Sequence, residues 1–146
     1  RAKQVIDRAL PAFGQAVIAE NSSRSITEVP YHRSRKLSRD YATGKTRIEM
    51  VKDRGRHTIE DINLTISGRG DDIYTIHSDD PLSAQSEAHY CITMKRDKTF
   101  DIQVKTDFTL TSTENDFLLT ATAQAFEGVK RVFVREWAER IPRKFV

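Results

Sequence analysis

The chain has 146 residues, of which 38% are hydrophobic and 31% are charged, and its formal net charge is +3. This length suits a single domain with a hydrophobic core, and no apolar run reaches the roughly 18 residues that a membrane helix needs. Cys91 is the only cysteine, which excludes an internal disulfide and a zinc site built from several cysteines. No signal peptide is visible, so we expect a cytoplasmic protein that binds no membrane.

Positive charge gathers in the first half of the chain. Residues 1–69 contain 14 Lys or Arg and 8 Asp or Glu, whereas residues 70–146 contain 10 and 13. The densest basic cluster consists of His32, Arg33, Arg35, Lys36 and Arg39. Such a cluster is typical either of a module that binds nucleic acid or another anionic partner, or of a solvated segment. Because no aromatic stacking surface or known binding motif accompanies it, we expect no nucleic-acid partner.

The first 35 residues show no clear strand pattern. Their apolar residues follow a helical stripe at Val5, Ile6, Leu10, Phe13 and Val17. Pro11 and Gly14 interrupt this stripe, so the pattern predicts only a short helix near Ala2–Ala9, or an extended segment. We expect residues 1–35 to fold over the rest of the chain, and residues 36–146 to form a β domain.

From Lys36 onward, apolar alternation and turn residues follow one another along the chain. The expected strands are Leu37–Tyr41, Thr46–Val51, Thr58–Ile66, Ile73–Ile76, Ser86–Met94, Thr99–Leu110, Phe117–Phe126 and Arg131–Trp137. The expected turns include Ala42–Gly44, Asp53–Gly55, Gly68–Gly70, Asp79–Ala84, Ser112–Asn115 and Glu127–Gly128. This spacing predicts a mainly β fold, an antiparallel meander of about eight strands. A sheet of this size is expected to curl, or to close into a barrel or sandwich.

The clearest strand is Thr99–Leu110, in which apolar and polar residues alternate with period two. The residues expected to share one inward face are Phe100, Ile102, Val104, Phe108 and Leu110, with Tyr90, Ile92, Phe117 and Leu119 from neighbouring strands. Phe117–Phe126 also places Leu118 and Phe126 on its other side, which predicts a second apolar surface. We expect the N-terminal segment, with another subunit or domain, to cover this surface.

No motif for catalysis or for cofactor binding is visible. The chain has no G-x-S-x-G elbow, no phosphate-binding loop and no dinucleotide fingerprint. Ser83 follows Asp80, but no histidine is placed to act as a base, so a serine that caps a turn is the preferred interpretation. We therefore expect no enzymatic activity and no cofactor in this chain.

Three further groups admit a functional and a structural interpretation. His89 and Cys91 share one side of a strand, where they either begin a metal site or form an inert polar face, and the second is preferred. The acidic pairs Asp71–Asp72 and Asp79–Asp80 lack the spacing of a calcium loop, so solvated turns are preferred. Trp137, flanked by Arg135 and Arg140, is either an interface anchor or a packed core residue, and these two remain open.

The second half of the chain resembles the C-terminal end of CocE/NonD-type hydrolases, which are relatives of cocaine esterase and the X-prolyl dipeptidyl peptidases. The resemblance lies in five short motifs that occur in the same order as in the family. They are Ile76-His77-Ser78-Asp79-Asp80-Pro81-Leu82-Ser83-Ala84, Asp116-Phe117, Ala125-Phe126-Glu127-Gly128, Val132-Phe133-Val134-Arg135-Glu136-Trp137 and Ile141-Pro142-Arg143. Arg39–Gly44 and Asp53–Gly55 look like the lead-in of the same family. Lys144 departs from it, because the family often has an acidic residue there.

This resemblance implies a role and no catalytic residue. Such hydrolases carry a Ser-Asp-His triad in an α/β-hydrolase domain, followed by a jelly roll and, in long members, a further β region. The chain looks like that last region, so the triad is expected upstream of Arg1 and the partners are expected to be the upstream domains or a second subunit. The alternatives are a β-barrel that binds a small apolar ligand and the basic binding module described above.

Overall fold

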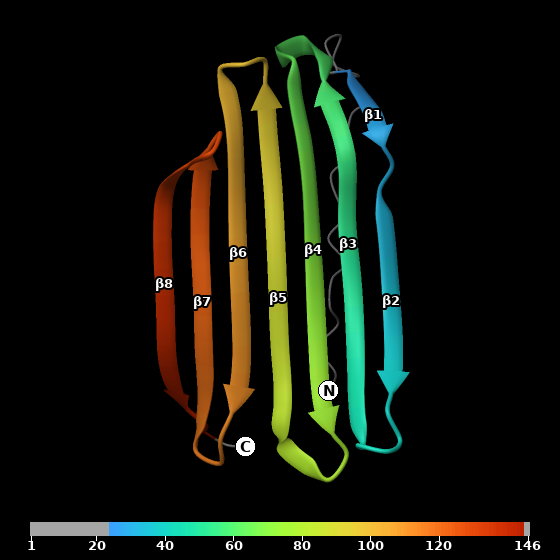
Figure 1. The fold of residues 1–146 in the computed structure, drawn as a ribbon, viewed down its shortest axis with the longest axis vertical. Coiled ribbons are helices and arrows are strands. Elements are labelled where there is room, and N and C mark those ends of the chain that lie inside the picture. Colours follow the sequence, from blue (N-terminus) through green and yellow to red (C-terminus); the bar gives the residue numbers. More distant parts are fainter. Residues whose placement is uncertain (1–23, 145–146) are drawn as a thin grey trace, which may run out of the picture.

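The computed structural model describes residues 24–144, which form one antiparallel sheet of eight strands (Figure 1). The strands are β1 (Ser25–Val29), β2 (His32–Arg39), β3 (Lys45–Ile59), β4 (Leu64–His77), β5 (Asp80–Arg96), β6 (Phe100–Ser112), β7 (Asp116–Glu127) and β8 (Lys130–Pro142), with one short 3-10 helix, η1 (Glu60–Ile62). The mainly β class, the antiparallel meander and the number of strands are therefore confirmed.

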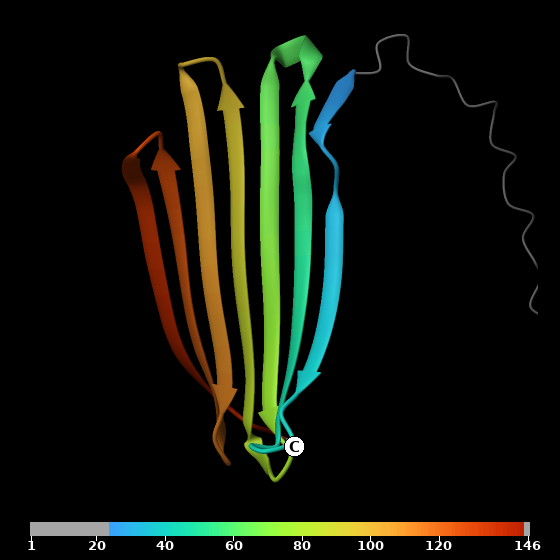
Figure 2. The ribbon, with the colours of Figure 1, turned by 45° about the vertical axis from the view of Figure 1, so that its right-hand side comes forward.

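The strands from β3 to β8 pair in chain order, each with the next. β1 and β2 lie one after the other along the free side of β3, so they form one edge of the sheet and β8 forms the other. The sheet is curled and open, without closure into a barrel (Figure 2). Residues 25–35 belong to the sheet, so the β domain begins earlier than Lys36. The expected helix near Ala2–Ala9 lies outside the described residues.

Two expected turns are wrong, because Asp53–Gly55 and Gly68–Gly70 lie inside the long strands β3 and β4. Gly55 has a φ of +66° at a register shift between Asp53 and Arg56, which is a β-bulge that only glycine fits easily. An added Cβ at Gly55 would overlap the backbone oxygen of Val29. Glycine therefore serves here to bend a continuous strand, where the sequence suggested that the strand ended.

The connection between β3 and β4 occurs instead at η1, inside the expected strand Thr58–Ile66. Asn63 closes this connection in the left-handed region with a φ of 48°, and its N–H donates to the carbonyl oxygen of Glu60 at 3.1 Å. Asparagine tolerates this conformation better than most residues. Because Ile62, Leu64 and Ile66 alternate like strand residues, the sequence pattern did not indicate this turn, which depends on the left-handed conformation of Asn63.

The register divides the side chains of the sheet into two faces. One, the apolar face, carries Ile48, Met50, Ile66, Tyr74, Ile76, Tyr90, Ile92, Met94, Ile102, Val104, Phe108, Leu110, Phe117, Leu119, Phe133 and Trp137. This set includes eight of the nine residues expected to face inward, and Phe100 lies two positions before Ile102 on the same face. The expected facing of β6 and its neighbours is therefore confirmed.

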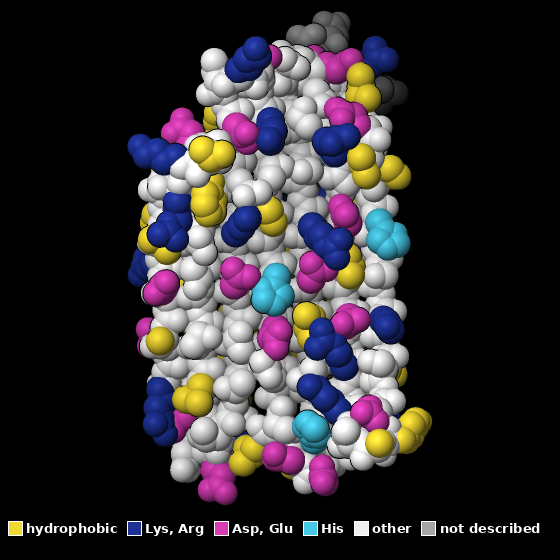
Figure 3. Space-filling view, in the orientation of Figure 1, with side chains coloured by type: hydrophobic (Ala, Val, Ile, Leu, Met, Phe, Trp, Pro, Cys, Tyr) yellow, Lys and Arg dark blue, Asp and Glu magenta, His cyan; other side chains and the backbone are white. Residues whose placement is uncertain are grey.

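The other side of the sheet, the polar face, carries charges of both signs over its central strands (Figure 3). Its residues include Arg47, Glu49, Asp53, Arg69, Asp71, Glu87, His89, Lys95, Asp101, Lys105 and Asp107. Several of them form exposed ion pairs, such as Lys95 Nζ with Asp101 Oδ2 at 3.0 Å. This face is suited to water.

Within residues 24–144, nothing covers the apolar face, and no hydrophobic side chain is fully buried. Tyr74, Ile76 and Ile92 are 42%, 40% and 38% exposed, although they lie on the inner strands β4 and β5. A sheet that is apolar on one side normally packs that side against a second layer. The described part of the chain supplies one layer and lacks the other.

Candidate functional site

A polar cluster lies in the middle of the apolar face, where Lys52 of β3, Asp72 of β4 and Tyr90 of β5 meet. Lys52 Nζ is 2.6 Å from Asp72 Oδ2, and the Tyr90 hydroxyl donates to Asp72 Oδ1 at 2.7 Å. The Asp72 side chain is only 8% exposed, whereas that of Lys52 is 44% exposed. Oδ2 makes no well-aligned hydrogen bond, so Lys52 acts on it through charge. Asp72 is thus a buried carboxylate that depends on two neighbours.

Gly70 makes room for this cluster. Gly70 lies directly opposite Tyr90 in the β4–β5 pairing, and an added Cβ at Gly70 would overlap the Tyr90 ring. The ring therefore lies over the bare backbone of β4, which allows its hydroxyl to reach Asp72 two residues further along the strand. The glycine that suggested a turn in the sequence positions a hydrogen bond in the structure.

The pKa values of the cluster favour a permanent ion pair. Burial alone would raise the pKa of Asp72, but the Lys52 ammonium 2.6 Å away and the hydrogen bond from the Tyr90 hydroxyl lower it. The close contact with Asp72 raises the pKa of Lys52, and the hydrogen bond to Asp72 is the main cause of the raised pKa of Tyr90. A general acid or base works best with a pKa near the working pH, and all three pKa values move away from neutrality. The cluster is suited to fixing structure, and it is unsuited to proton transfer.

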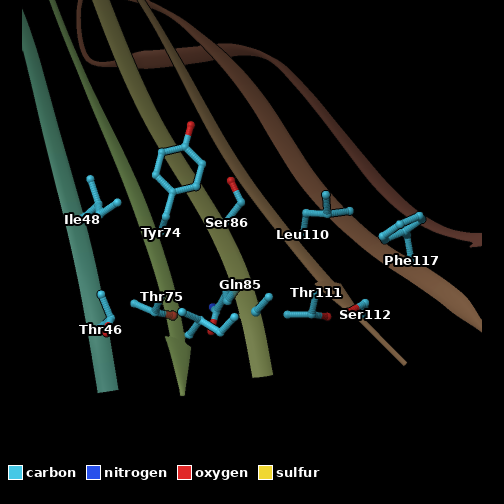
Figure 4. Close-up of a pocket in the computed structure, with 12 residues that line it drawn as sticks. Thr46, Ile48, Tyr74, Thr75, Gln85, Ser86, Leu110, Thr111, Ser112 and Phe117 are labelled. Atoms are coloured by element: carbon cyan, nitrogen blue, oxygen red, sulfur yellow. The ribbon is translucent and has the colours of Figure 1, made fainter. Parts of the chain in front are cut away.

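A hollow of about 310 Å³ lies on the apolar face beside this cluster, near the end of β3 that begins at Lys45 (Figure 4). Ile48, Tyr74, Leu110 and Phe117 line it from four different strands, with small residues such as Ser86 between them. Its walls are almost wholly apolar, and its volume is at the lower limit for small-molecule sites. The sheet therefore offers an apolar depression that is bordered by a few polar residues, among them Tyr74, Ser86 and Gln85.

Ser83 caps the turn before β5, as the preferred interpretation of the sequence stated. Its Oγ accepts from the His77 N–H at 2.8 Å and donates to the Asp80 carbonyl oxygen at 2.5 Å. Asp80 Oδ1 in turn accepts from the Leu82 N–H at 2.9 Å. Because both the donor and the acceptor capacity of Ser83 are used by backbone groups, nothing here activates the hydroxyl as a nucleophile.

His89 lies on the polar face and pairs with Asp107 across the β5–β6 ladder, with 2.7 Å between His89 Nδ1 and Asp107 Oδ1. This hydrogen bond is the main cause that raises the pKa of His89. Cys91 lies two positions along the same face. Among residues 24–144 there is no group of three or more His, Cys, Asp or Glu side chains that could hold a metal ion.

The acidic pairs are not brought together. Asp71 lies on the polar face, where both of its carboxylate oxygens accept from Arg69, whereas Asp72 lies on the apolar face with Lys52. Asp79 lies in the β4–β5 turn, whereas Asp80 is the first residue of β5 and pairs with His77. The expected turn Asp79–Ala84 is therefore shorter than predicted, because its residues from Asp80 onward belong to β5. The expectation of a solvated turn is wrong for Asp71–Asp72, which continues β4.

The C-terminal motifs meet in one corner of the sheet. Asp116, which is only 8% exposed, accepts from Arg140 Nε at 2.7 Å. Arg143 donates from Nη1 to the Thr113 carbonyl oxygen at 3.0 Å, and its guanidinium lies 5.2 Å from the centre of the Phe117 ring. Arg143 follows Pro142 directly and so extends β8 into this corner. These contacts tie the end of β8 to the β6–β7 turn, which is a structural role.

The other motif residues lie along β8 and its turn. Glu127 ends β7, and Gly128 follows with a φ of +57° while its N–H donates to the Asp101 carbonyl oxygen at 2.7 Å. Arg135 stacks on the Trp137 ring at 4.9 Å, and both belong to the apolar face. Trp137 is half-buried and opposite Ala121, whereas Arg140 is on the polar face with Asp116. Arg140 is therefore not part of an anchor around Trp137.

The basic cluster forms β2, whose residues are all exposed at the edge of the sheet. Arg33 stacks on the Tyr31 ring at 4.7 Å and Arg39 on the Tyr41 ring at 5.4 Å, so two exposed tyrosines do flank the basic residues. Tyr31 is 47% exposed and Tyr41 is 85% exposed, so both rings stay open to solvent beside their arginines. The strand therefore supplies positive charge with two exposed aromatic rings next to it.

The sequence analysis missed the Lys52–Asp72–Tyr90 cluster. Lys52 and Asp72 occupy positions of the apolar alternation, two residues from Met50 and Tyr74 respectively. A charged residue at an apolar-face position was the available signal. It was hidden because the turns expected at Asp53–Gly55 and Gly68–Gly70 put both residues near strand ends.

Comparisons of this chain with protein-family models, with curated proteins and with solved structures find no match. In the described range 24–144, no helix is long and apolar enough to cross a membrane.

Proposed function

We propose that the chain is a non-catalytic accessory β domain of a serine α/β-hydrolase of the CocE/NonD type, and that its apolar face packs against another domain of the same polypeptide. The observation that carries this proposal is the open apolar face, on which inner-strand side chains such as Ile76 and Ile92 are about two-fifths exposed. Exposed apolar surface of this extent marks an interface. The motifs that resemble the family supply the identity of the partner domain.

The shape and charge of the sheet agree with this docking. The polar face carries ion pairs and charges of both signs over its central strands, so the apolar face is the side that most requires a cover. Lys52 and Asp72 neutralise each other in the middle of the apolar face, which lets this part of the face enter an interface without an unpaired charge. The tightly bonded corner around Asp116 and Arg143 holds the last strand in place beside the hollow, where Arg143 stacks on the Phe117 ring.

The first prediction concerns catalysis. A serine-reactive fluorophosphonate is expected to label no serine of the 146-residue chain, because Ser83 is held by two backbone hydrogen bonds and has no histidine as a base. Mass spectrometry of the treated chain measures this, with a known serine esterase as the positive control. Stoichiometric labelling of any serine would contradict a non-catalytic role.

The second prediction concerns docking. Ile76→Lys, on the apolar face, is expected to reduce the binding of a hydrophobic dye to the isolated chain and to lower the stability of the full natural polypeptide. Thr109→Lys is the matched control, because Thr109 lies on the polar face of β6 opposite Glu87 and should change neither quantity. If both variants behave alike in dye binding and in thermal unfolding of the full polypeptide, the docking face is wrong.

The same full polypeptide tests the identity of the partner. Sequencing the gene upstream of the codon for Arg1 is expected to show a G-x-S-x-G elbow in the same reading frame. A reading frame without this elbow contradicts the hydrolase part of the proposal and leaves the docking experiment valid.

A second candidate function is the binding of a small apolar ligand in the hollow lined by Ile48, Tyr74, Leu110 and Phe117 (Figure 4). The apolar walls favour it, and the hydroxyls of Tyr74 and Ser86 at its border are available to orient a ligand. Titration with a fluorescent fatty acid distinguishes the two candidates, because saturable binding that Leu110→Glu abolishes supports the ligand site. The basic module is a weaker alternative, and it requires a salt-dependent affinity for nucleic acid.

A further inference from the structure

The two edges of the sheet differ in a way that bears on self-association. An edge strand exposes unpaired backbone N–H and C=O groups, and proteins protect it with charge, proline or short length. β2 is eight residues long and carries only basic charges, so a second copy of β2 would be repelled. β8 is 13 residues long and carries both signs, with Pro142 only at its end. β8 is therefore the unprotected edge.

The side chains of β8 also remain exposed on both faces. Phe133 is 50% exposed on the apolar face, and Val134 is 46% exposed on the polar face, although β7 pairs along the whole strand. Val132 and Ile141 are 52% and 46% exposed. Nothing described lies beside the free edge of this strand.

We propose that β8 pairs with β8 of a second copy of this chain, antiparallel and with Trp137 opposite Trp137 of that copy. A two-fold axis perpendicular to the sheet keeps the two apolar faces on the same side, so only residues of one face can lie opposite each other. In this register Arg135 lies opposite Glu139, and Phe133 lies opposite Ile141, each pair occurring twice. Opposite charges and apolar pairs across antiparallel strands are both stabilising.

The polar face is compatible with the same register. There Glu136 lies opposite Ala138, and Val134 lies opposite Arg140, so no like charges meet between Phe133 and Ile141. Arg140 keeps its ion pair with Asp116 on β7, which lies on the other side of β8. The dimer therefore requires no existing contact to break.

Neighbouring registers are worse. Centring the axis on Arg135 or on Glu136 places two identical charges opposite each other at the axis. Centring it on Ala138 places Trp137 opposite Glu139 and leaves Phe133 without a partner on the strand. Among the registers centred on residues 135 to 138, the sequence of β8 thus favours the one centred on Trp137. This inference goes beyond the accessory role proposed above and does not depend on it, because the docking face and the β8 edge are different surfaces.

The first test is charge reversal in the 146-residue chain, with mass in solution measured by light scattering over a range of concentrations. The unchanged chain is expected to reach twice its mass of 16.7 kDa. Arg135→Glu and Glu139→Arg are each expected to weaken the dimer about tenfold or more, since each creates two like-charge pairs. Mixing the two variants is expected to restore the dimer, because the pairs become complementary between them.

The matched control is Glu136→Arg, which faces Ala138 in the proposed register and should leave the dimer unchanged. A chain that stays monomeric at all concentrations overturns the proposal. So does a dimer that survives Arg135→Glu, or one that Glu136→Arg disrupts instead, because that result requires a different register or surface.

The second test does not depend on charge. With Cys91 replaced by serine, Trp137→Cys is expected to form a disulfide between two copies under mild oxidation, since Cα atoms directly opposite across antiparallel strands are within the range of a disulfide. Val134→Cys in the same background should remain reduced, because the two copies of residue 134 would be about 20 Å apart. Equal cross-linking of both variants, or none of Trp137→Cys, contradicts the register.

Discussion

Replacing Lys52 with methionine is expected to lower the free energy of unfolding at neutral pH, and by more than the loss of a fully exposed ion pair does. Methionine keeps much of the length of the lysine stem, so the change removes mainly the charge. The Asp72 carboxylate, whose side chain is only 8% exposed, would then keep one neutral donor, the Tyr90 hydroxyl. A buried charge without its counter-ion is among the costliest single changes in a protein. Urea unfolding followed by the fluorescence of Trp137 measures the loss.

Removing the other partner of the ion pair, Asp72, is expected to lower the free energy of unfolding by less. Asp72→Asn removes the buried charge itself, and the Lys52 side chain, already 44% exposed, can turn into water. The control pair is Lys95 and Asp101 on the polar face, whose side chains are 57% and 43% exposed. Lys95→Met should cost under about 1 kcal/mol, as exposed ion pairs do. If Lys52→Met costs no more than Lys95→Met, Asp72 is not the buried carboxylate described above.

The effect of pH gives an independent check of the same pair. The pKa of Asp72 is lowered in the folded chain, because its contacts with Lys52 and Tyr90 outweigh the effect of burial. Such a group adds stability above its unfolded pKa of about 3.8, and that stability is lost as the pH falls through the lower folded pKa. The difference in the free energy of unfolding between the unchanged chain and the Lys52→Met variant should therefore shrink below about pH 4. A difference that is constant from pH 7 to pH 3 would mean that lost packing of the lysine stem causes the effect.

The sequence predicted the β class and the facing of β6 because both depend on local alternation. Phe100, Ile102 and Val104 alternate with polar residues whatever the rest of the chain does. The sequence could not predict that β3 and β4 are continuous. Asp53-Arg54-Gly55 has the composition of a turn, and only the pairing with neighbouring strands makes it a bulge.

The polar cluster could not be predicted for a related reason. Lys52, Asp72 and Tyr90 are far apart in the chain and meet through the register of β3, β4 and β5. The β3–β4 part of that register depends on the tight turn at Asn63 and on the bulge at Gly55, and the β4–β5 part depends on the turn after His77 and a shift between Thr75 and His77. The Ser83 cap, in contrast, is formed by residues within one turn, and the sequence did predict it.

Phe108→Ala is expected to have the other large effect, and its size should depend on the cover of the apolar face. Phe108 lies between Ala88 of β5 and Ala121 of β7. Because these two neighbours are small, the Phe108 ring supplies most of the apolar surface at this point of the face. Removing a fully buried phenylalanine side chain costs about 3–5 kcal/mol. We expect this cost in the full natural polypeptide, in which the proposed docking covers the ring.

In the isolated chain the ring of Phe108 is only half-buried, so the same substitution is expected to cost about 1–2 kcal/mol, in proportion to the apolar area that it removes from water. Lys105→Ala is the control, because Lys105 is exposed on the polar face of the same strand and should cost under about 0.5 kcal/mol in both proteins. Chemical denaturation of the four variants measures these differences. Equal effects of Phe108→Ala and Lys105→Ala would mean that the faces are wrongly assigned. An equal cost of Phe108→Ala in the isolated chain and in the full polypeptide would instead leave the faces intact and show that the second layer lies elsewhere.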